Sequence, residues 1–171
     1  MTVVLTPDME AIIRAAHLCF AATVTPEGRP NVSPKGTIRV WDARHLFFLD
    51  IASPGTRANL AVQPYMEINV VEALSRRGYR FSGPVTMHES GEIFDNAVGM
   101  VMSEEGSTYE VVSVVMLELE HAAPLLSPGY WHVADETAMR ASWRERRAAL
   151  DKEFELHIAR HGAFRLAGQR R

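Results

Sequence analysis

Residues 18–50 read LCFAATVTPEGRPNVSPKGTIRVWDARHLFFLD, three largely apolar runs separated by two short turn-like segments. The first segment, Thr25-Pro26-Glu27-Gly28, has proline at its second position and glycine at its fourth, which is typical of a type I turn. The second, Trp41-Asp42-Ala43-Arg44, is equally short. Because runs joined by such short turns pair in opposite directions, the stretch predicts an antiparallel sheet or barrel. Its strands are expected at residues 18–25, 30–40 and 45–50.

The flanking sequence continues this mainly β pattern and adds peripheral helices. Thr6-Pro7-Asp8 has the hydroxyl, proline and acid that often begin a helix, which should end near His17. Ser53-Pro54-Gly55-Thr56 begins a second short helix, which ends before Pro64. A further helix is expected over residues 91–102. Three more strands are expected at residues 65–72, 79–89 and 110–120, the middle one bent near Gly83-Pro84.

Residues 135–160 form a different kind of segment. They contain neither proline nor glycine and carry many charges. Apolar side chains recur among these charges at helical spacing, namely Met139, Trp143, Leu150 and Phe154. The pattern predicts one long amphipathic helix, or two broken ones, that packs through those side chains.

The composition narrows the functional classes. A formal net charge of −3 over 171 residues does not suggest a nucleic-acid-binding protein, which usually has a basic excess. No apolar run reaches the ~18 residues of a membrane span and no secretory pattern begins the sequence, so we expect a cytoplasmic protein without membrane contact. The one cysteine, Cys19, excludes an internal disulfide and is expected to be a buried small hydrophobe. His157 and His161 share a helix face, with Glu153 one turn earlier, but no further ligand cluster is visible, so no metal site is predicted.

Three segments have the chemistry of ligand binding, each with an ordinary alternative. Residues 53–59 combine hydroxyls and Arg57 with the free N–H groups of a helix start, which suits phosphate, although ordinary capping is commoner. Ser33-Pro34-Lys35-Gly36 interrupts a strand and marks either an edge kink or a place where a ligand approaches the backbone. The arginines of residues 76–80 indicate either a second anion site or a solvated turn.

Taken in order, these segments resemble the pyridoxamine 5′-phosphate oxidase-like FMN-binding split-barrel family. The resemblance covers roughly residues 5–124 and rests on the order and spacing of residues 25–40, 46–48, 53–60, 64–68 and 78–83. It implies a six-stranded antiparallel split β-barrel that forms a homodimer, with FMN across the dimer interface. We therefore expect an FMN-binding domain over residues 1–124 and a helical extension over 125–171 that packs on the barrel or on the dimer.

The resemblance also implies site residues. Those that would line the flavin come from the second strand and are Ser33, Pro34 and Lys35. Those that would bind or support the phosphate are Arg39, Ser53, Thr56, Arg57 and Asn59.

The expected function is that of an FMN-dependent oxidoreductase with a small-molecule substrate. The alternative is a non-catalytic module that holds flavin, haem or a deazaflavin in the same barrel. No residue stands out as a general acid or base. The stretch from Phe164 to Gln169 does not match the substrate-binding motif of true pyridoxamine phosphate oxidases, so oxidation of vitamin B6 is not expected.

Overall fold

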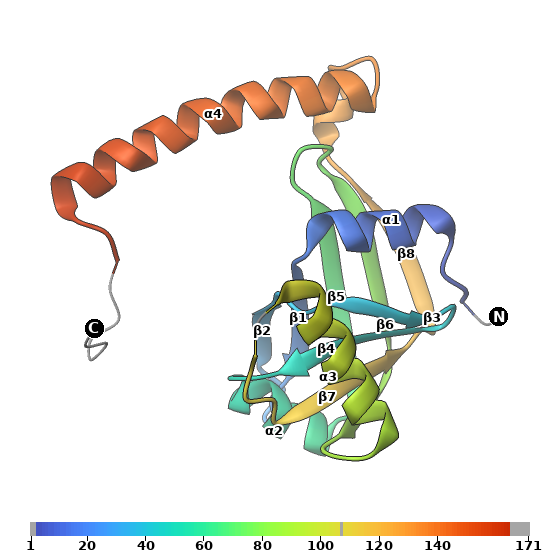
Figure 1. The fold of residues 1–171 in the computed structure, drawn as a ribbon. Helices are drawn as coiled ribbons and strands as arrows, with labels where there is room; N and C mark the ends of the chain where they lie inside the picture. The colour runs from blue at the N-terminus through green and yellow to red at the C-terminus, as the bar shows by residue number, and fades with distance from the viewer. Residues whose placement is uncertain (1–2, 107, 165–171) are drawn as a thin grey trace. The chain divides into compact units, whose positions relative to one another are not determined.

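The computed structural model describes residues 3–106 and 108–164, so most of the stretch from Phe164 to Gln169 lies outside the described residues. Its elements divide into two compact units, the larger made of the chain up to Ala73 and from Arg77 to Ser127. The elements of this unit (Figure 1) are α1 (Pro7–Ala16), β1 (Cys19–Val24), β2 (Pro30–Lys35), β3 (Arg39–Asp42), β4 (His45–Asp50), α2 (Pro54–Val62), β5 (Tyr65–Glu72), β6 (Arg77–His88), α3 (Glu92–Glu105), β7 (Ser113–Glu118) and β8 (His121–Leu126).

The fold is mainly antiparallel sheet, as predicted, but eight strands take part where six were expected. Their order is β2-β1-β5-β6-β7-β4-β3, and β8 pairs with β6. Strand β6 is shared: residues 77–84 pair with β5, and residues 85–88 pair with β7. This change of partner strand occurs at the predicted bend, where a Cβ atom on Gly83 would lie 1.9 Å from the carbonyl oxygen of Glu118. Only glycine therefore allows the two strands to approach this closely.

Two of the eight strands explain why the expected count was too low. The run over residues 30–40 is split into β2 and β3, because Gly36 and Thr37 leave the ladder. The Thr37 hydroxyl instead bonds the backbone of Leu49, accepting from its N–H at 2.9 Å and donating to its C=O at 3.4 Å. Strand β8 contains Pro124, which weakens the sequence signal, and it lies off the main strand order, paired with β6.

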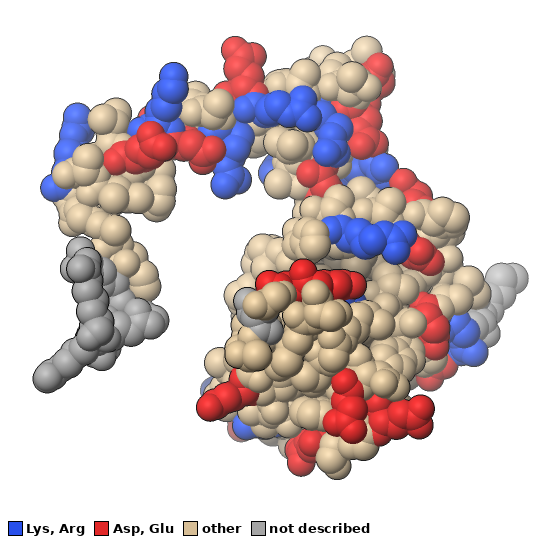
Figure 2. Space-filling view, in the orientation of Figure 1, with Lys and Arg blue, Asp and Glu red and all other residues tan. Residues whose placement is uncertain are grey.

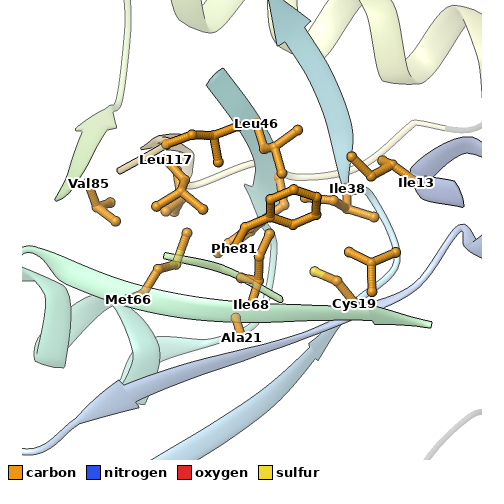
Figure 3. Close-up of a cluster of buried hydrophobic side chains, with 14 of the residues drawn as sticks. Ile13, Cys19, Ala21, Ile38, Leu46, Met66, Ile68, Phe81, Val85 and Leu117 are labelled. Carbon is orange, nitrogen blue, oxygen red and sulfur yellow. The ribbon is translucent and has the colours of Figure 1, made fainter. Parts of the chain in front are cut away.

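The main core lies where the two parts of the sheet face each other. Figure 3 shows side chains from β1, β4, β5, β6 and β7 pointing toward one another. Phe48, Ile68, Phe81 and Leu117 are all fully buried there. Burying each such side chain stabilises the fold by about 1.5–3 kcal/mol. A second cluster packs α3, through Ala97 and Val101, against β4 and β7.

Helix α1 follows the predicted signature and is held in place through its first turn. The Thr6 hydroxyl accepts from the Met9 N–H at 3.3 Å, and Ile12 and Ile13 are buried. The Asp8 carboxylate accepts two hydrogen bonds from Arg77 and one from the Tyr79 hydroxyl, all on β6. The helix start is therefore both capped and tied to the sheet.

The smaller unit consists of residues 74–76 and the chain from Pro128 onward. It contains a 3-10 helix, η1 (Pro128–Trp131), and α4 (Glu136–His161), which confirms one long helix rather than two. The Tyr130 hydroxyl donates to the Ser75 carbonyl at 2.7 Å, and Met139 is buried.

The packing of α4 differs from the prediction. Leu150 and Phe154 are 47% and 65% exposed, because the residues of this unit surround only the first two turns of the helix. No helix within the described residues is long and apolar enough to cross a membrane.

Candidate functional site

A cavity of about 520 Å³ lies where β2, β4 and α2 meet, within the larger unit. This volume is within the range of small-molecule sites. Its walls come from the end of β2, the segment that joins β4 to α2, and the end of α3. The lining residues are Ser33, Pro34, Lys35, Gly36, Thr37, Leu49, Ile51, Ala52, Ser53, Glu105 and Tyr109. The structure thus brings together the predicted Ser33, Pro34, Lys35 and Ser53.

Lys35 is the positive charge in this wall. Only 6% of the residue is exposed; its ammonium group donates to the Ser33 hydroxyl at 2.6 Å and lies 5.4 Å from the centre of the Phe48 ring. Burial lowers the pKa of Lys35, and the negative charge of Asp50 opposes that shift. The side chain therefore presents N–H donors and a positive charge at the cavity.

The start of α2 is open to an anion. Ser53 makes no capping hydrogen bond, and of the four α-helices among the described residues only α2 has no acid in its first turn. The hydroxyl of Thr56 is buried in that turn and has no hydrogen-bond partner within the described residues. A buried hydroxyl without a partner costs about 1–3 kcal/mol, so a bound acceptor is its natural complement.

Asp50, the last residue of β4, organises the segment before α2. Its carboxylate is 1% exposed and accepts from the Ser53 N–H at 3.0 Å, the Ser53 hydroxyl at 2.5 Å and the Arg57 guanidinium at 2.7 Å. Arg57 is thus already paired with a carboxylate, and neither it nor Thr56 is among the residues that line the cavity. Sequence reasoning missed Asp50, because an acid at a strand end is common and nothing local reveals its burial.

Two further predicted residues, Asn59 and Arg39, do not line this cavity. Asn59 is buried and donates to the Thr23 hydroxyl at 2.9 Å, which joins α2 to β1. Arg39 does not line the cavity with Lys35. Its guanidinium pairs with Glu104 at 2.6 Å and Glu105 at 2.8 Å, and it lines a different cavity, of about 290 Å³, beside α1.

Glu105 and Tyr109 form a wall that the sequence did not predict. The Tyr109 hydroxyl donates to Glu105 at 2.6 Å, while Arg39 holds the other carboxylate oxygen. The hydrogen bond from Tyr109, with support from Arg39, lowers the pKa of Glu105. These residues reach the cavity only through the packing of α3 on β4 and β7, for which the sequence contains no local signal.

The other candidate groups lie outside this site. Arg77 is bound to Asp8, and Arg80 pairs with Glu67 at 3.1 Å, so the predicted arginine cluster is divided among separate partners. Burial raises the pKa of the Cys19 thiol to about 12, which leaves it unreactive. Within residues 3–106 and 108–164 no three His, Cys, Asp or Glu side chains are grouped as a metal site.

The residues of this region fit a phosphorylated cofactor such as FMN. The Thr56 hydroxyl and the first N–H groups of α2 suit a phosphate, and Ser33 and Lys35 supply donors along the cavity wall. Leu49, Ile51 and Ala52 supply apolar surface.

Comparison with known proteins agrees with this chemistry. A family model described as pyridoxamine 5′-phosphate oxidase matches residues 5–124. No curated protein matches the chain.

Several solved structures share the fold. HupZ of Group A Streptococcus has 27% identity and a TM-score of 0.65, over 72% of this chain and 95% of its own. An FMN-binding protein from Syntrophomonas wolfei has 15% identity and a TM-score of 0.59, over 68% and 82%. HutZ, a heme storage protein from Vibrio cholerae, has 21% identity and a TM-score of 0.58, over 74% and 95%.

Proposed function

The chain belongs to the pyridoxamine 5′-phosphate oxidase family, and on that premise we propose that it binds FMN and acts as a flavin-dependent oxidoreductase on a small-molecule substrate. The observation that carries this proposal is the start of α2, which has no acid in its first turn and holds the unpartnered Thr56 hydroxyl. When bound, FMN supplies the hydride or electron chemistry, and the protein positions it.

The proposed roles of the side chains follow from their positions. The phosphate of FMN accepts from Thr56 and from the first N–H groups of α2. Ser53 and Arg57 act through Asp50, which fixes the segment that leads into the helix. Ser33 and Lys35 donate to polar atoms of the flavin from the cavity wall. Asn59 positions α2 through its hydrogen bond to Thr23.

A second copy of the chain is part of the proposal. Every outward side chain of β1 and β2 is apolar, and they pair across the strands as Phe20 with Pro34, Ala22 with Val32 and Val24 with Pro30. Phe20 is 49% exposed and Val32 62%. A continuous apolar face of this kind marks an interaction surface. It continues to Pro34 in the cavity wall, so a homodimer formed here would also cover the site.

The test compares FMN with riboflavin, which lacks the phosphate, using Thr56→Val. If the hydroxyl serves the phosphate, the variant should bind FMN about 10-fold more weakly and bind riboflavin unchanged. The cofactor-free protein should become more stable by about 1 kcal/mol, because a buried unsatisfied hydroxyl is removed. Quenching of flavin fluorescence measures affinity, and chemical denaturation measures stability.

Ser113→Ala is the matched control, because the Ser113 hydroxyl is also buried without a partner within the described residues but belongs to β7 and not to the first turn of α2. It should leave both flavin affinities unchanged. Unchanged FMN binding by Thr56→Val, or equal losses of FMN and riboflavin, would contradict the phosphate assignment.

The second candidate function is a non-catalytic binding module for haem. It is favoured by the shared fold with HutZ, which is named a heme storage protein. The visible spectrum of the purified protein separates the candidates: flavin absorbs in the blue, and haem shows a Soret band. A Soret band without flavin absorbance would replace the FMN proposal.

A further inference from the structure

Helix α4 carries a seam of side chains that is bare within the described residues. The seam consists of Arg147, Leu150, Phe154, His157 and His161, spaced alternately three and four residues apart. All five are exposed. The rings of Phe154 and His157 lie 6.2 Å apart, and those of His157 and His161 lie 4.7 Å apart, so aromatic surface continues along the seam. This spacing keeps one face of a helix directed at a partner helix.

The same face is already used for packing at the start of α4. Met139 is 2% exposed, and the guanidinium of Arg76 lies 4.2 Å above the Trp143 ring. Arg146 also lies 5.2 Å from that ring. Among the described residues of this unit, the face is therefore packed as far as Trp143 and exposed from Arg147 onward.

We propose that this bare seam pairs antiparallel with the same seam of a second copy. The two-fold axis would pass between Glu155 and Leu156. Phe154 then packs against the partner's His157, and Leu150 packs against the partner's His161. Each contact occurs twice, as a two-fold interface requires.

The charged residues that flank the seam favour this antiparallel arrangement. Figure 2 shows acidic and basic side chains interspersed along α4. In the proposed register Glu153 faces the partner's Arg160, and Arg160 faces the partner's Glu153. Neither residue has an ion-pair partner in the described part of the chain, so both are available for these contacts. Opposite charges at such flanking positions fix orientation and partner.

Other arrangements of the two helices are less favourable. A parallel pair would place Arg147 against the partner's Arg147. An antiparallel pair shifted by seven residues toward the start of the helix would place Glu153 against the partner's Glu153 and would require His161 to pack on the partner's Trp143. Arg76 and Arg146 already lie against the Trp143 ring, so that register lacks room.

The proposed contact is small, since it spans about 18 Å of helix. Such an overlap is below the usual size of an interface that holds two proteins by itself. Its effect is therefore expected when two copies are already brought together, because linkage makes a second contact effectively intramolecular.

The test is disulfide trapping in the full chain. One preparation carries Leu150→Cys and another His161→Cys, and the two are mixed under mild oxidation. The native Cys19 does not interfere, since it is buried and its pKa is raised. The proposal predicts that disulfides between the two kinds of chain form faster than disulfides within either kind. Parallel pairing predicts the reverse. The background is a mixture of one variant with the parent chain, and a rate of disulfide formation no higher than this background would also overturn the proposal.

Charge exchange then tests the register. Introducing Glu153→Arg into both chains replaces two attractions by two repulsions and should slow trapping about 10-fold. Combining Glu153→Arg with Arg160→Glu restores opposite charges and should restore the rate. Arg146→Glu is the matched control and should have no effect, because the level of Arg146 in this register lies beyond the partner's His161, the last residue of α4. An unchanged rate with Glu153→Arg, or failure of the exchange to restore it, would contradict the pairing. None of these readouts depends on flavin.

Discussion

Helices α1 and α2 begin with nearly the same sequence signature but end up in different chemical surroundings. Thr6-Pro7-Asp8 begins one, and Ser53-Pro54-Gly55 begins the other. In α1 the hydroxyl caps the helix and acids occupy the first turn. In α2 the hydroxyl instead donates to Asp50, and the first turn contains no acid.

This difference shows how one signature serves two purposes. The positive end of α1 is neutralised by its own chain, through Asp8 and Glu10. The positive end of α2 is left without a negative charge in its first turn, beside a cavity and with a buried hydroxyl in that turn. The first is a structural helix start, and the second has the properties of a binding site.

The largest effect should come from removing the acid beside α2. Asp50→Ala leaves the Ser53 hydroxyl and N–H without their acceptor and breaks a pair with Arg57, so we expect a loss of about 3 kcal/mol in the free energy of unfolding. Asp8→Ala, at the exposed start of α1, should cost about 1 kcal/mol. Urea denaturation of both variants measures the difference. Equal losses would mean that Asp50 is no more important to the fold than Asp8.

A smaller effect is expected when the start of α2 is made to resemble that of α1. Gly55→Asp introduces an acid into the first turn, and a side chain built there meets no atom within 4 Å. We expect FMN binding to weaken about 10- to 30-fold through repulsion of the phosphate, with riboflavin much less affected. Gly55→Asn has the same size without the charge and is the control. If both variants lose FMN equally, the loss is steric and the electrostatic comparison fails.

The smallest effect concerns acid stability through α1. Hydrogen bonds from Arg77 and Tyr79 lower the pKa of Asp8 from 3.8 to about 2. Its contribution to stability is therefore complete above about pH 4 and is lost as the pH falls toward 2, because the unfolded chain takes up the proton first. Asp8 is 45% exposed, so screening by water limits the contribution to about 1 kcal/mol.

Asp8→Asn should flatten the dependence of unfolding free energy on pH in that range. Glu10→Gln is the control in the same helix, since the pair of Glu10 with the exposed Arg14 lies within α1. If Asp8→Asn leaves the dependence of unfolding free energy on pH unchanged, the hydrogen bonds from Asp8 to β6 do not stabilise the fold.

Much of this protein follows from local sequence. The short turns and alternating runs predicted the antiparallel sheet, and Thr6-Pro7 and Ser53-Pro54 predicted where α1 and α2 begin. The absence of proline and glycine predicted a C-terminal segment of one long helix or two broken ones, and the structure has one. Ser33, Lys35 and Ser53 were named from local chemistry and family resemblance, and the structure places them around one cavity. Such features are decided by a few neighbouring residues, which sequence patterns record well.

Tertiary structure alone decided which partners those residues meet. Arg39 and Arg57 were both expected to bind the phosphate of FMN. In the structure Arg39 pairs with Glu104 and Glu105 at the end of α3, and Arg57 pairs with the buried Asp50. Glu105 and Tyr109 reach the cavity only because α3 packs on β4 and β7. Leu150 and Phe154 have the spacing of buried residues, but the residues that cover the start of α4 do not extend to them. The physical reason is the same in each case: burial and charge pairing depend on contacts between segments far apart in the chain, which no local pattern contains.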